Sequence, residues 1–197
     1  MIKVGITGGI GSGKTYVCRL FQSFGIPVYF ADDRAKHLMQ EDDDLIADLV
    51  HAFGAAIYEE GRLQRAALAE KVFGDAEALR TLNGIVHPAV ARDADRWMQN
   101  HTDSPYVLKE AALLFESGSY QRLDSNILVY ASEEVRILRV MKRDGVSEDE
   151  VRARMAHQWS DERKMELADY MIHNDGTRDM GRLVERFHTL FSQRYVA

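Results

Sequence analysis

Short apolar runs alternate with helical patterns along most of this chain. Five of these runs are rich in β-branched or aromatic residues: IKVGIT (2–7), PVYFA (27–31), YVLKEAAL (106–113), NILVYA (126–131) and YMIHN (170–174). Nearly continuous apolar strands that alternate with helices are typical of a parallel sheet with helices on both faces. The pattern therefore predicts a three-layer α/β/α fold with these runs as its strands.

Two of the predicted helices show a clear apolar face. The helix after the first run stops before Gly25, and its apolar face consists of Val17, Leu20, Phe21 and Phe24. The last helix repeats Leu183, Phe187, Leu190 and Phe191 at a similar spacing. The first helix completes a strand–loop–helix unit, and the last should pack on the sheet.

Two segments fall outside this alternation. The stretch between residues 31 and 106 is longer than one crossover helix needs, so residues 35–100 are expected to form a helical insertion. In residues 143–163, Ser147 and Glu150 form a capping box before a helix with few large apolar residues. We expect this segment to be a mobile lid, and we expect the core to comprise residues 1–34, 101–142 and 164–197.

Composition narrows the possible functions. The net charge of −6 has the wrong sign for binding a nucleic-acid backbone, and no apolar run approaches the ~20 residues that span a bilayer. The chain runs from MIKV into GITGG without a secretory signal, so we expect a cytoplasmic protein. The only cysteine, Cys18, excludes an internal disulfide and should be buried. The seven histidines show no zinc spacing, so any metal should be held by oxygen atoms.

The loop after the first run carries the clearest chemistry. Residues 8–15, GGIGSGKT, match the G-x-x-x-x-G-K-[ST] motif in the strand–loop–helix context that it requires. The glycines let successive N–H groups converge on phosphate oxygens at a helix N-terminus. The Lys14 ammonium would bind the β- and γ-phosphates, and the Thr15 hydroxyl would bind Mg²⁺. We predict a nucleoside triphosphate site formed by Gly9, Ile10, Gly11, Ser12, Gly13, Lys14, Thr15 and Tyr16.

Other motifs distinguish the protein classes that share this loop. A GTPase would carry NKxD and DxxG, and neither occurs in the sequence. An oligomeric ATPase would carry an apolar strand ending in Asp-Glu, of which VLKE (107–110) is a poor version. A kinase of a small substrate remains, with the insertion as its acceptor site.

Seven stretches resemble the dephospho-CoA kinase family in order and spacing, over essentially the whole chain. They are KVGITGGIGSGKT (3–15), GIPVYFADDRAK (25–36), VHP (86–88), ALLFESG (112–118), RVMKRDGVS (139–147), RARMAHQ (152–158) and IHNDGT (172–177). The resemblance implies a P-loop kinase fold with a five-stranded parallel core, a helical CoA-binding domain and a lid.

The same resemblance implies the reaction and its participants. A phosphoryl group would pass from ATP, with Mg²⁺, to the ribose 3′-hydroxyl of dephospho-CoA, in the last step of CoA synthesis. The expected partners are these two small molecules, with no nucleic acid and no membrane. The chain is expected to be a monomer or a weak homo-oligomer.

Two adjacent aspartates follow the second run. If this stretch is extended, Asp32 and Asp33 point to opposite faces, and only one can face the glycine loop. The family has Asp-Ala-Asp here, which places Phe30 at the first aspartate and Asp32 at the second. Asp32 is thereby expected to be the base that takes the proton of the acceptor hydroxyl, with helix capping as the alternative. Asp33 would cap or begin the next helix.

Three arginines, Arg136, Arg139 and Arg143, share one face of the helix before the lid. Such a stripe is often only a solvated surface. Because RVMKRD matches the lid entrance of the family, we expect Arg139 and Arg143 to bind the transferring phosphate. Arg152 and Arg154 on the lid are either further contacts or surface residues.

The family resemblance also assigns residues at the ends of two later runs. Glu110 stands where the family usually has Asp, and would hold Mg²⁺ through water or else balance Lys109. Asn174 and Gly176 follow the last run, where such kinases meet adenine.

The acceptor side is expected to involve two further stretches. Leu114, Phe115 and Glu116 would wall the acceptor pocket at the carboxyl edge of the sheet, in addition to simple packing. His87 with Pro88 would either contact the acceptor or end a helix.

Two alternatives share the phosphate loop. A P-loop kinase of another small acceptor, such as a nucleoside monophosphate or a polyol, would differ only in its acceptor domain. A nucleotide-gated binding module would need a partner surface, and the sequence shows no apolar stripe or partner motif for one.

Overall fold

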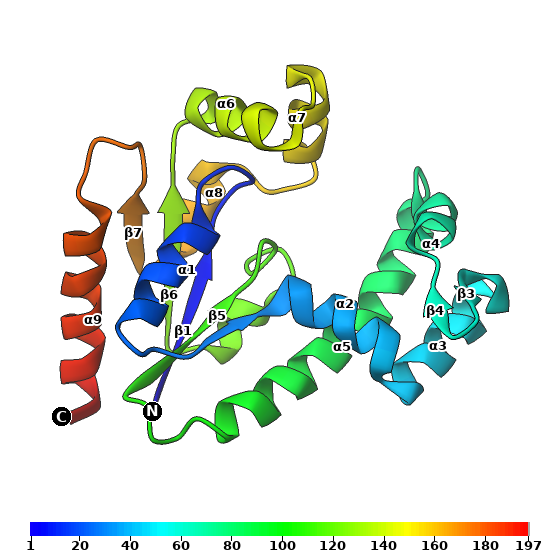
Figure 1. The fold of residues 1–197 in the computed structure, drawn as a ribbon, viewed down its shortest axis with the longest axis horizontal. Helices are drawn as coiled ribbons and strands as arrows, with labels where there is room; N and C mark the ends of the chain where they lie inside the picture. The colour runs from blue at the N-terminus through cyan, green and yellow to red at the C-terminus, as the bar shows by residue number, and fades with distance from the viewer. Residues whose placement is uncertain (197) are drawn as a thin grey trace. The chain divides into compact units, whose positions relative to one another are not determined.

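A computed structural model describes the backbone of residues 1–196 and the side chains of residues 1–194 (Figure 1). The chain divides into two compact units. One comprises residues 1–30 together with the chain from residue 98 onward, and the other comprises Ala31–Trp97. Within the described residues, no helix is both long enough and apolar enough to cross a membrane.

The first unit is built on a five-stranded parallel sheet in the order β2-β5-β1-β6-β7 (Figure 1). All neighbouring strands are parallel, and the strands are β1 (Ile2–Thr7), β2 (Val28–Phe30), β5 (Tyr106–Glu110), β6 (Ser125–Tyr130) and β7 (Tyr170–His173). The five apolar runs are thus confirmed as strands. Because β1 lies in the middle, the loop that follows it emerges between the ends of β5 and β6.

Two strands end before their apolar runs do. The run 27–31 ends as β2 at Phe30, because Ala31 already begins a helix. The run 106–113 ends as β5 at Glu110. Glu110 pairs with Ile6 of β1 and with Phe30 of β2, and these are the last pairs that β5 forms with the two strands.

Two helices cover one face of this sheet and form the main core with it. They are α1 (Lys14–Ser23) and α9 (Met180–Val196), which contact each other as well as β1 and β5. Their fully buried side chains are Val17, Cys18, Phe21, Val184 and Phe191. The expected packing of the last helix and the burial of the cysteine are both confirmed. This packing fixes the helix that begins at the glycine loop.

The opposite face of β1 is covered by the chain that follows β5. A methyl group added at Gly5 would lie 2.7 Å from the Leu114 side chain and 2.8 Å from that of Leu123. A short 3₁₀ turn, η2 (Ser119–Arg122), lies between these leucines, and α8 (Asp161–Leu167) contacts β6.

A smaller apolar cluster joins α6 (Glu133–Asp144) to α7 (Glu148–Met155). Its buried members are Ile137, Val140 and Val151, and the side chain of Ile10 packs against them. The predicted capping box of Ser147 and Glu150 begins α7.

The second unit is mainly helical. It contains α2 (Ala31–Glu41), α3 (Asp43–Phe53), a 3₁₀ turn η1 (Ala55–Ile57), α4 (Arg65–Val72) and most of α5 (Ala76–Gln99). Leu45, Leu49 and Ile57 are fully buried inside it. A 2.9 Å ion pair from Arg34 to Asp93 links α2 to α5.

Two features of this unit differ from the sequence-based expectation. A hairpin of β3 (Tyr58–Glu59) and β4 (Arg62–Leu63) lies within it, and the apolar pattern did not predict it. Pro88 lies inside α5, so the alternative that it ends a helix is wrong. A proline within a helix clashes with the carbonyl four residues earlier, and here that carbonyl belongs to Gly84.

Candidate functional site

The glycine loop has a backbone that only glycine suits at two positions. Gly11 and Gly13 have φ angles of 81° and 89°. A methyl group at Gly11 would lie 2.5 Å from the Arg136 carbonyl oxygen, and one at Gly13 would lie 2.2 Å from the Asn174 amide nitrogen. Both conformation and space therefore exclude a side chain, which lets the backbone itself face a ligand.

The loop ends at a helix N-terminus that can receive an anion. Gly13 precedes α1, gives it no side-chain cap, and is followed by a first turn that contains no acidic residue. No carboxylate in the first turn therefore offsets the partial positive charge at the N-terminus of α1. The Lys14 ammonium donates a 2.8 Å hydrogen bond to the Gly8 carbonyl, and the buried Ser12 hydroxyl has no partner. Thr15 and Tyr16 are exposed in the first turn.

Asn174 fixes the loop from the end of β7. Its amide nitrogen donates a 2.8 Å hydrogen bond to the Ser12 carbonyl, and the residue is buried. Asn174 therefore supports the backbone of the loop, a contact that the sequence did not indicate. Gly176 follows with a φ of 88°. The expected contact of these two residues with adenine stays a prediction.

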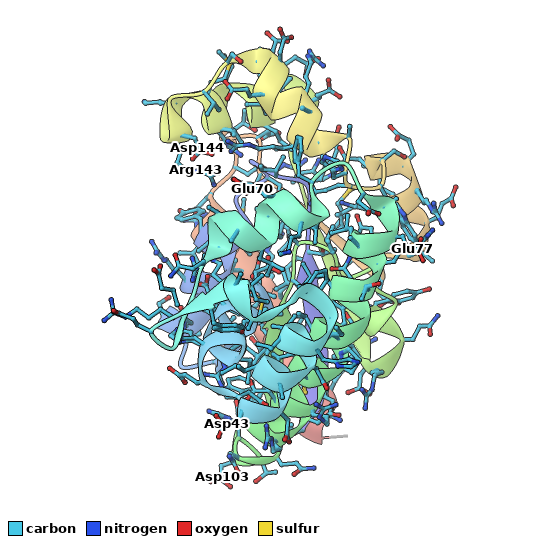
Figure 2. The ribbon with its side chains drawn as sticks, turned by 90° about the vertical axis from the view of Figure 1, so that its right-hand side faces the viewer. Asp43, Glu70, Glu77, Asp103, Arg143 and Asp144 are labelled. Carbon is cyan, nitrogen blue, oxygen red and sulfur yellow. The ribbon has the colours of Figure 1, made fainter. Side chains whose placement is uncertain are left out.

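The two arginines expected to bind phosphate have different surroundings. A methyl group added at Gly13 or at Gly176 would lie 4.0 Å from a guanidinium nitrogen of Arg139, so this cation lies at the loop. Its Nη1 is buried and has no partner. Arg143 is exposed at the end of α6, and its Nε lies 2.7 Å from Oδ1 of Asp144 (Figure 2). This bond raises the pKa of Arg143. The structure thus brings Arg139 to the loop and directs Arg143 to a carboxylate.

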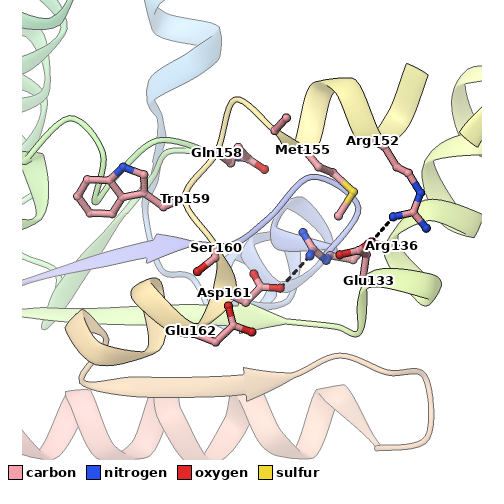
Figure 3. A pocket seen from close by; sticks show the side chains of 10 residues that line it. Glu133, Arg136, Arg152, Met155, Gln158, Trp159, Ser160, Asp161 and Glu162 are labelled. Atoms are coloured by element: carbon pink, nitrogen blue, oxygen red, sulfur yellow. Dashed lines mark hydrogen bonds and ion pairs between the residues drawn. The ribbon is translucent and has the colours of Figure 1, made fainter. Parts of the chain in front are cut away.

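A third arginine of the same helix face lies even closer to the loop. A methyl group at Gly9 would lie 1.9 Å from Nη1 of Arg136, whose Nη2 donates a 2.8 Å hydrogen bond to Asp161 (Figure 3). Both side chains are largely buried, and burial raises the pKa of Asp161 against the effect of Arg136. The sequence placed Arg136 in the stripe but did not show that it would be the buried member.

Arg136 and Asp161 line a pocket of about 380 Å³ (Figure 3). Its other residues come from α6, from α7 and from the chain after α7, including Gln158 and Trp159. An ion pair between Arg152 and Glu133 lies at this pocket. Arg152 also pairs with Glu148, so its guanidinium is held by two carboxylates.

Glu110 ends β5 as a buried carboxylate, and β5 packs against α1. The pKa of Cys18 in α1 is raised, first by burial and then by the Glu110 carboxylate, while the Lys14 ammonium lowers it. Both charges therefore act on the same thiol. A carboxylate, the Thr15 hydroxyl and phosphate oxygens are ligands that suit Mg²⁺.

Leu114, Phe115 and Glu116 lie in the chain that follows β5 and covers one face of β1. Leu114 and Phe115 are buried, so packing accounts for them, and their contact with an acceptor stays a prediction. Glu116 accepts a 3.0 Å hydrogen bond from the Trp159 backbone, and the same carboxylate oxygen lies 3.1 Å from the ammonium of Lys164. Lys164 is fully buried, and this contact lacks hydrogen-bond geometry, so it is an ion pair only.

The predicted residues of the second unit lie on two helices. Asp32 and Asp33 are exposed in the first turn of α2, so the assumption of an extended stretch was wrong. Successive residues of a helix nevertheless point about 100° apart. Asp33 forms a 2.7 Å ion pair with Lys36, as fits a first-turn residue, although α2 already begins at Ala31 and Asp33 is not its cap. His87 is exposed on α5.

Phe30, which stands at the first aspartate position of the family motif, belongs to the first unit. It ends β2, is partly buried and packs against the main core. An aspartate would lose this apolar contact, so the residue stabilises the edge strand.

Comparisons with known proteins identify the family of this chain. The family model of dephospho-CoA kinase matches residues 2–179. A dephospho-CoA kinase of Salinibacter ruber is 48% identical over 180 residues, which are 90% of this chain and 90% of that protein. One of Geobacillus kaustophilus is 37% identical and covers 90% of both chains.

Solved structures show the same fold over nearly the whole chain. A crystal structure of a Thermus thermophilus protein has a TM-score of 0.84 and 38% identity, and covers 96% of this chain and 97% of that one. Dephospho-CoA kinase from Campylobacter jejuni has a TM-score of 0.72 and 26% identity, and covers 97% of each chain. This chain therefore belongs to the dephospho-CoA kinase family.

Proposed function

We propose that this protein transfers the γ-phosphoryl group of ATP to the ribose 3′-hydroxyl of dephospho-CoA and thereby completes CoA synthesis. The observation that carries this proposal is the anion site at the start of α1. There the glycine loop, the Lys14 ammonium and the Arg139 guanidinium come together in a chain whose family match extends from residue 2 to residue 179.

The loop would bind the triphosphate through its backbone and Lys14. The residues expected to hold ATP are Gly9, Ile10, Gly11, Ser12, Gly13, Lys14, Thr15 and Tyr16, with Asn174 and Gly176 near the base. The loose transition state of phosphoryl transfer places its charge on the equatorial oxygens. Arg139 is proposed to stabilise that charge, and Arg143 would join it after leaving Asp144.

The proposed magnesium site uses oxygen ligands only. The Thr15 hydroxyl would bind the ion directly, and the Glu110 carboxylate would bind it through water. Bound Mg²⁺ would neutralise charge on the β- and γ-phosphates. The buried Glu110, whose charge acts on the same thiol as Lys14, supports this assignment.

Asp32 is proposed to accept the proton of the acceptor hydroxyl. It stands two residues beyond the end of β2 and is exposed in the first turn of α2. Its carboxylate would orient the 3′-hydroxyl for in-line attack. His87, Leu114, Phe115 and Glu116 are the further residues proposed for acceptor binding.

Residues 143–163 are proposed to be the lid, and residues 35–100 the CoA-binding domain. Closure of a lid would exclude water, which would otherwise take the phosphoryl group. The chain is proposed to act in the cytoplasm, as a monomer or a weak homo-oligomer.

Release of ADP with a panel of acceptors tests the proposal. The panel contains dephospho-CoA, nucleoside monophosphates and polyols, each with ATP and Mg²⁺. We expect turnover with dephospho-CoA to exceed that with every other acceptor, and the product to carry a 3′-phosphate. A preference for a monophosphate or a polyol would assign the protein to another group of P-loop kinases.

A further inference from the structure

One short segment after α7 contacts both the glycine loop and the residues that follow β5. We define residues 158–164 as the return segment, because they lead from α7 back to the sheet. Four of its residues make polar contacts with other parts of the first unit: Gln158, Trp159, Asp161 and Lys164. Of these four residues, Gln158 is the one that contacts the backbone of the glycine loop.

The Gln158 amide bridges two backbone groups. Its oxygen accepts a 2.8 Å hydrogen bond from the Ile10 N–H, and its nitrogen donates a 3.3 Å hydrogen bond to the Ala112 carbonyl. Ala112 follows Glu110 by two residues, and its carbonyl also lies 3.5 Å from the hydroxyl of Thr7 at the end of β1. One side chain therefore spans the distance between the phosphate loop and the strand end that carries the buried carboxylate.

The same residue is joined to α7. The Gln158 N–H donates a 2.9 Å hydrogen bond to the Met155 carbonyl, at the last residue of α7. Ile10 in turn packs its side chain against the cluster that contains Val151 of α7. The backbone and the side chain of Ile10 thus both connect the glycine loop to α7.

We infer that Gln158 is a positioning residue for phosphoryl transfer. It holds the Ile10 N–H and the Ala112 carbonyl at a fixed separation, which sets the glycine loop relative to Glu110 at the end of β5. The inference rests on the proposed function, and it adds a residue that acts through the backbone groups of Ile10 and Ala112. Transfer depends on such geometry because a misplacement of 1 Å can cost about 10²-fold in rate.

The substitution Gln158→Leu tests the inference, because it keeps the approximate size and removes both hydrogen bonds. The N–H groups and Lys14 that bind phosphate remain, so we expect the KM for ATP to change by less than roughly threefold. We expect kcat to fall by about 10- to 100-fold. The ratio of ADP released to CoA formed should rise above that of the unsubstituted protein, because the misplaced phosphoryl group reacts with water. Gln22→Leu, at an exposed position of α1, is the matched control and should leave all three quantities unchanged.

A second variant covers the case in which Gln158→Leu does not fold. Gln158→Glu keeps the acceptor for the Ile10 N–H but cannot donate to the Ala112 carbonyl, and it too should lower kcat with little change in KM. A kcat within about twofold of the unsubstituted protein, or a loss that disappears after correction for the folded fraction, overturns the inference. The proposed function fails separately, if the unsubstituted protein does not phosphorylate dephospho-CoA at all.

Discussion

Two adjacent carboxylates in α2 show how local surroundings separate similar residues. Asp33 is paired with Lys36 at 2.7 Å, and both of these side chains are largely exposed. An exposed pair of this kind contributes at most about 1 kcal/mol to stability. Asp32 precedes it in the same turn and is the residue proposed to act as the base.

Matched substitutions of this pair test the proposed base. Asp32→Asn should lower kcat by about 10²–10⁴-fold, because the amide cannot take the proton of the acceptor hydroxyl. ATP binding, measured by calorimetry in the absence of acceptor, should remain. Asp33→Asn carries the same change in charge one residue away and should retain near-normal turnover. Near-normal turnover of Asp32→Asn would remove the residue from the chemistry.

At the scale of elements, α5 contains two residues that weaken a helix. Pro88 lacks a backbone N–H, and Gly84 is exposed with no atom within 4 Å of the position that a methyl group would take. Gly84 is not among the glycines with positive φ, so alanine fits its backbone. Glycine within a helix costs about 0.5–1 kcal/mol relative to alanine.

Gly84→Ala should therefore raise the free energy of unfolding. We expect a gain of about 0.5–1 kcal/mol, because the unfolded chain loses conformational freedom and the helix loses none. Urea denaturation followed by circular dichroism measures it. Gly61→Ala is the contrasting variant, since Gly61 has a φ of 74° in the β3–β4 turn, and it should destabilise. A loss of stability in Gly84→Ala would contradict this account of α5.

The elements that the sequence predicts well are those with a strong period. The five strands and most of the buried faces of α1 and α9 follow from apolar spacing, although Phe24, on the predicted face of α1, is exposed. The capping box follows from the spacing of Ser147 and Glu150. The β3–β4 hairpin has strands of two residues, too short for any period to show. Its turn residues, Glu60 and Gly61, both have positive φ, and a glycine in such a turn was the available signal.

The site was predictable only where a motif fixes it. The glycine loop and Lys14 follow from spacing, whereas the contacts of Gln158, Asn174 and Arg136 with that loop join residues more than a hundred positions apart. No local pattern encodes such a contact. The start of α2 at Ala31 was missed because an apolar run and a helix meet there without a turn residue.

For the whole molecule, two buried groups link stability to alkaline pH. Burial raises the pKa of the Cys18 thiol and of the Tyr106 hydroxyl. The folded protein keeps both protons at pH values where the unfolded chain releases them, at about 8.5 and 10. Their contribution is therefore complete below these values and is lost as the pH rises above them.

The free energy of unfolding should fall by up to about 1.4 kcal/mol per pH unit for each group, from about pH 8.5 upward for the thiol and from about pH 10 upward for the hydroxyl. Urea denaturation between pH 8 and pH 11 measures the slope. Cys18→Ala removes one of the two groups and should give a shallower decline between pH 9 and pH 10. Equal slopes in both proteins would show that the thiol does not take part.

The central place of β1 in the sheet has a consequence for how the protein is made. The ribosome releases β1 well before its neighbours β5 and β6, which begin at Tyr106 and Ser125. Residues 31–97 form a compact unit of contiguous chain, so they can fold before β5 and β6 are available to pair with β1. Pairing across such long sequence separations is slow, because a large loop must close before any contact forms. The nascent chain thus gains its phosphate loop late, and ATP cannot assist its folding until β5 and β6 have been synthesised.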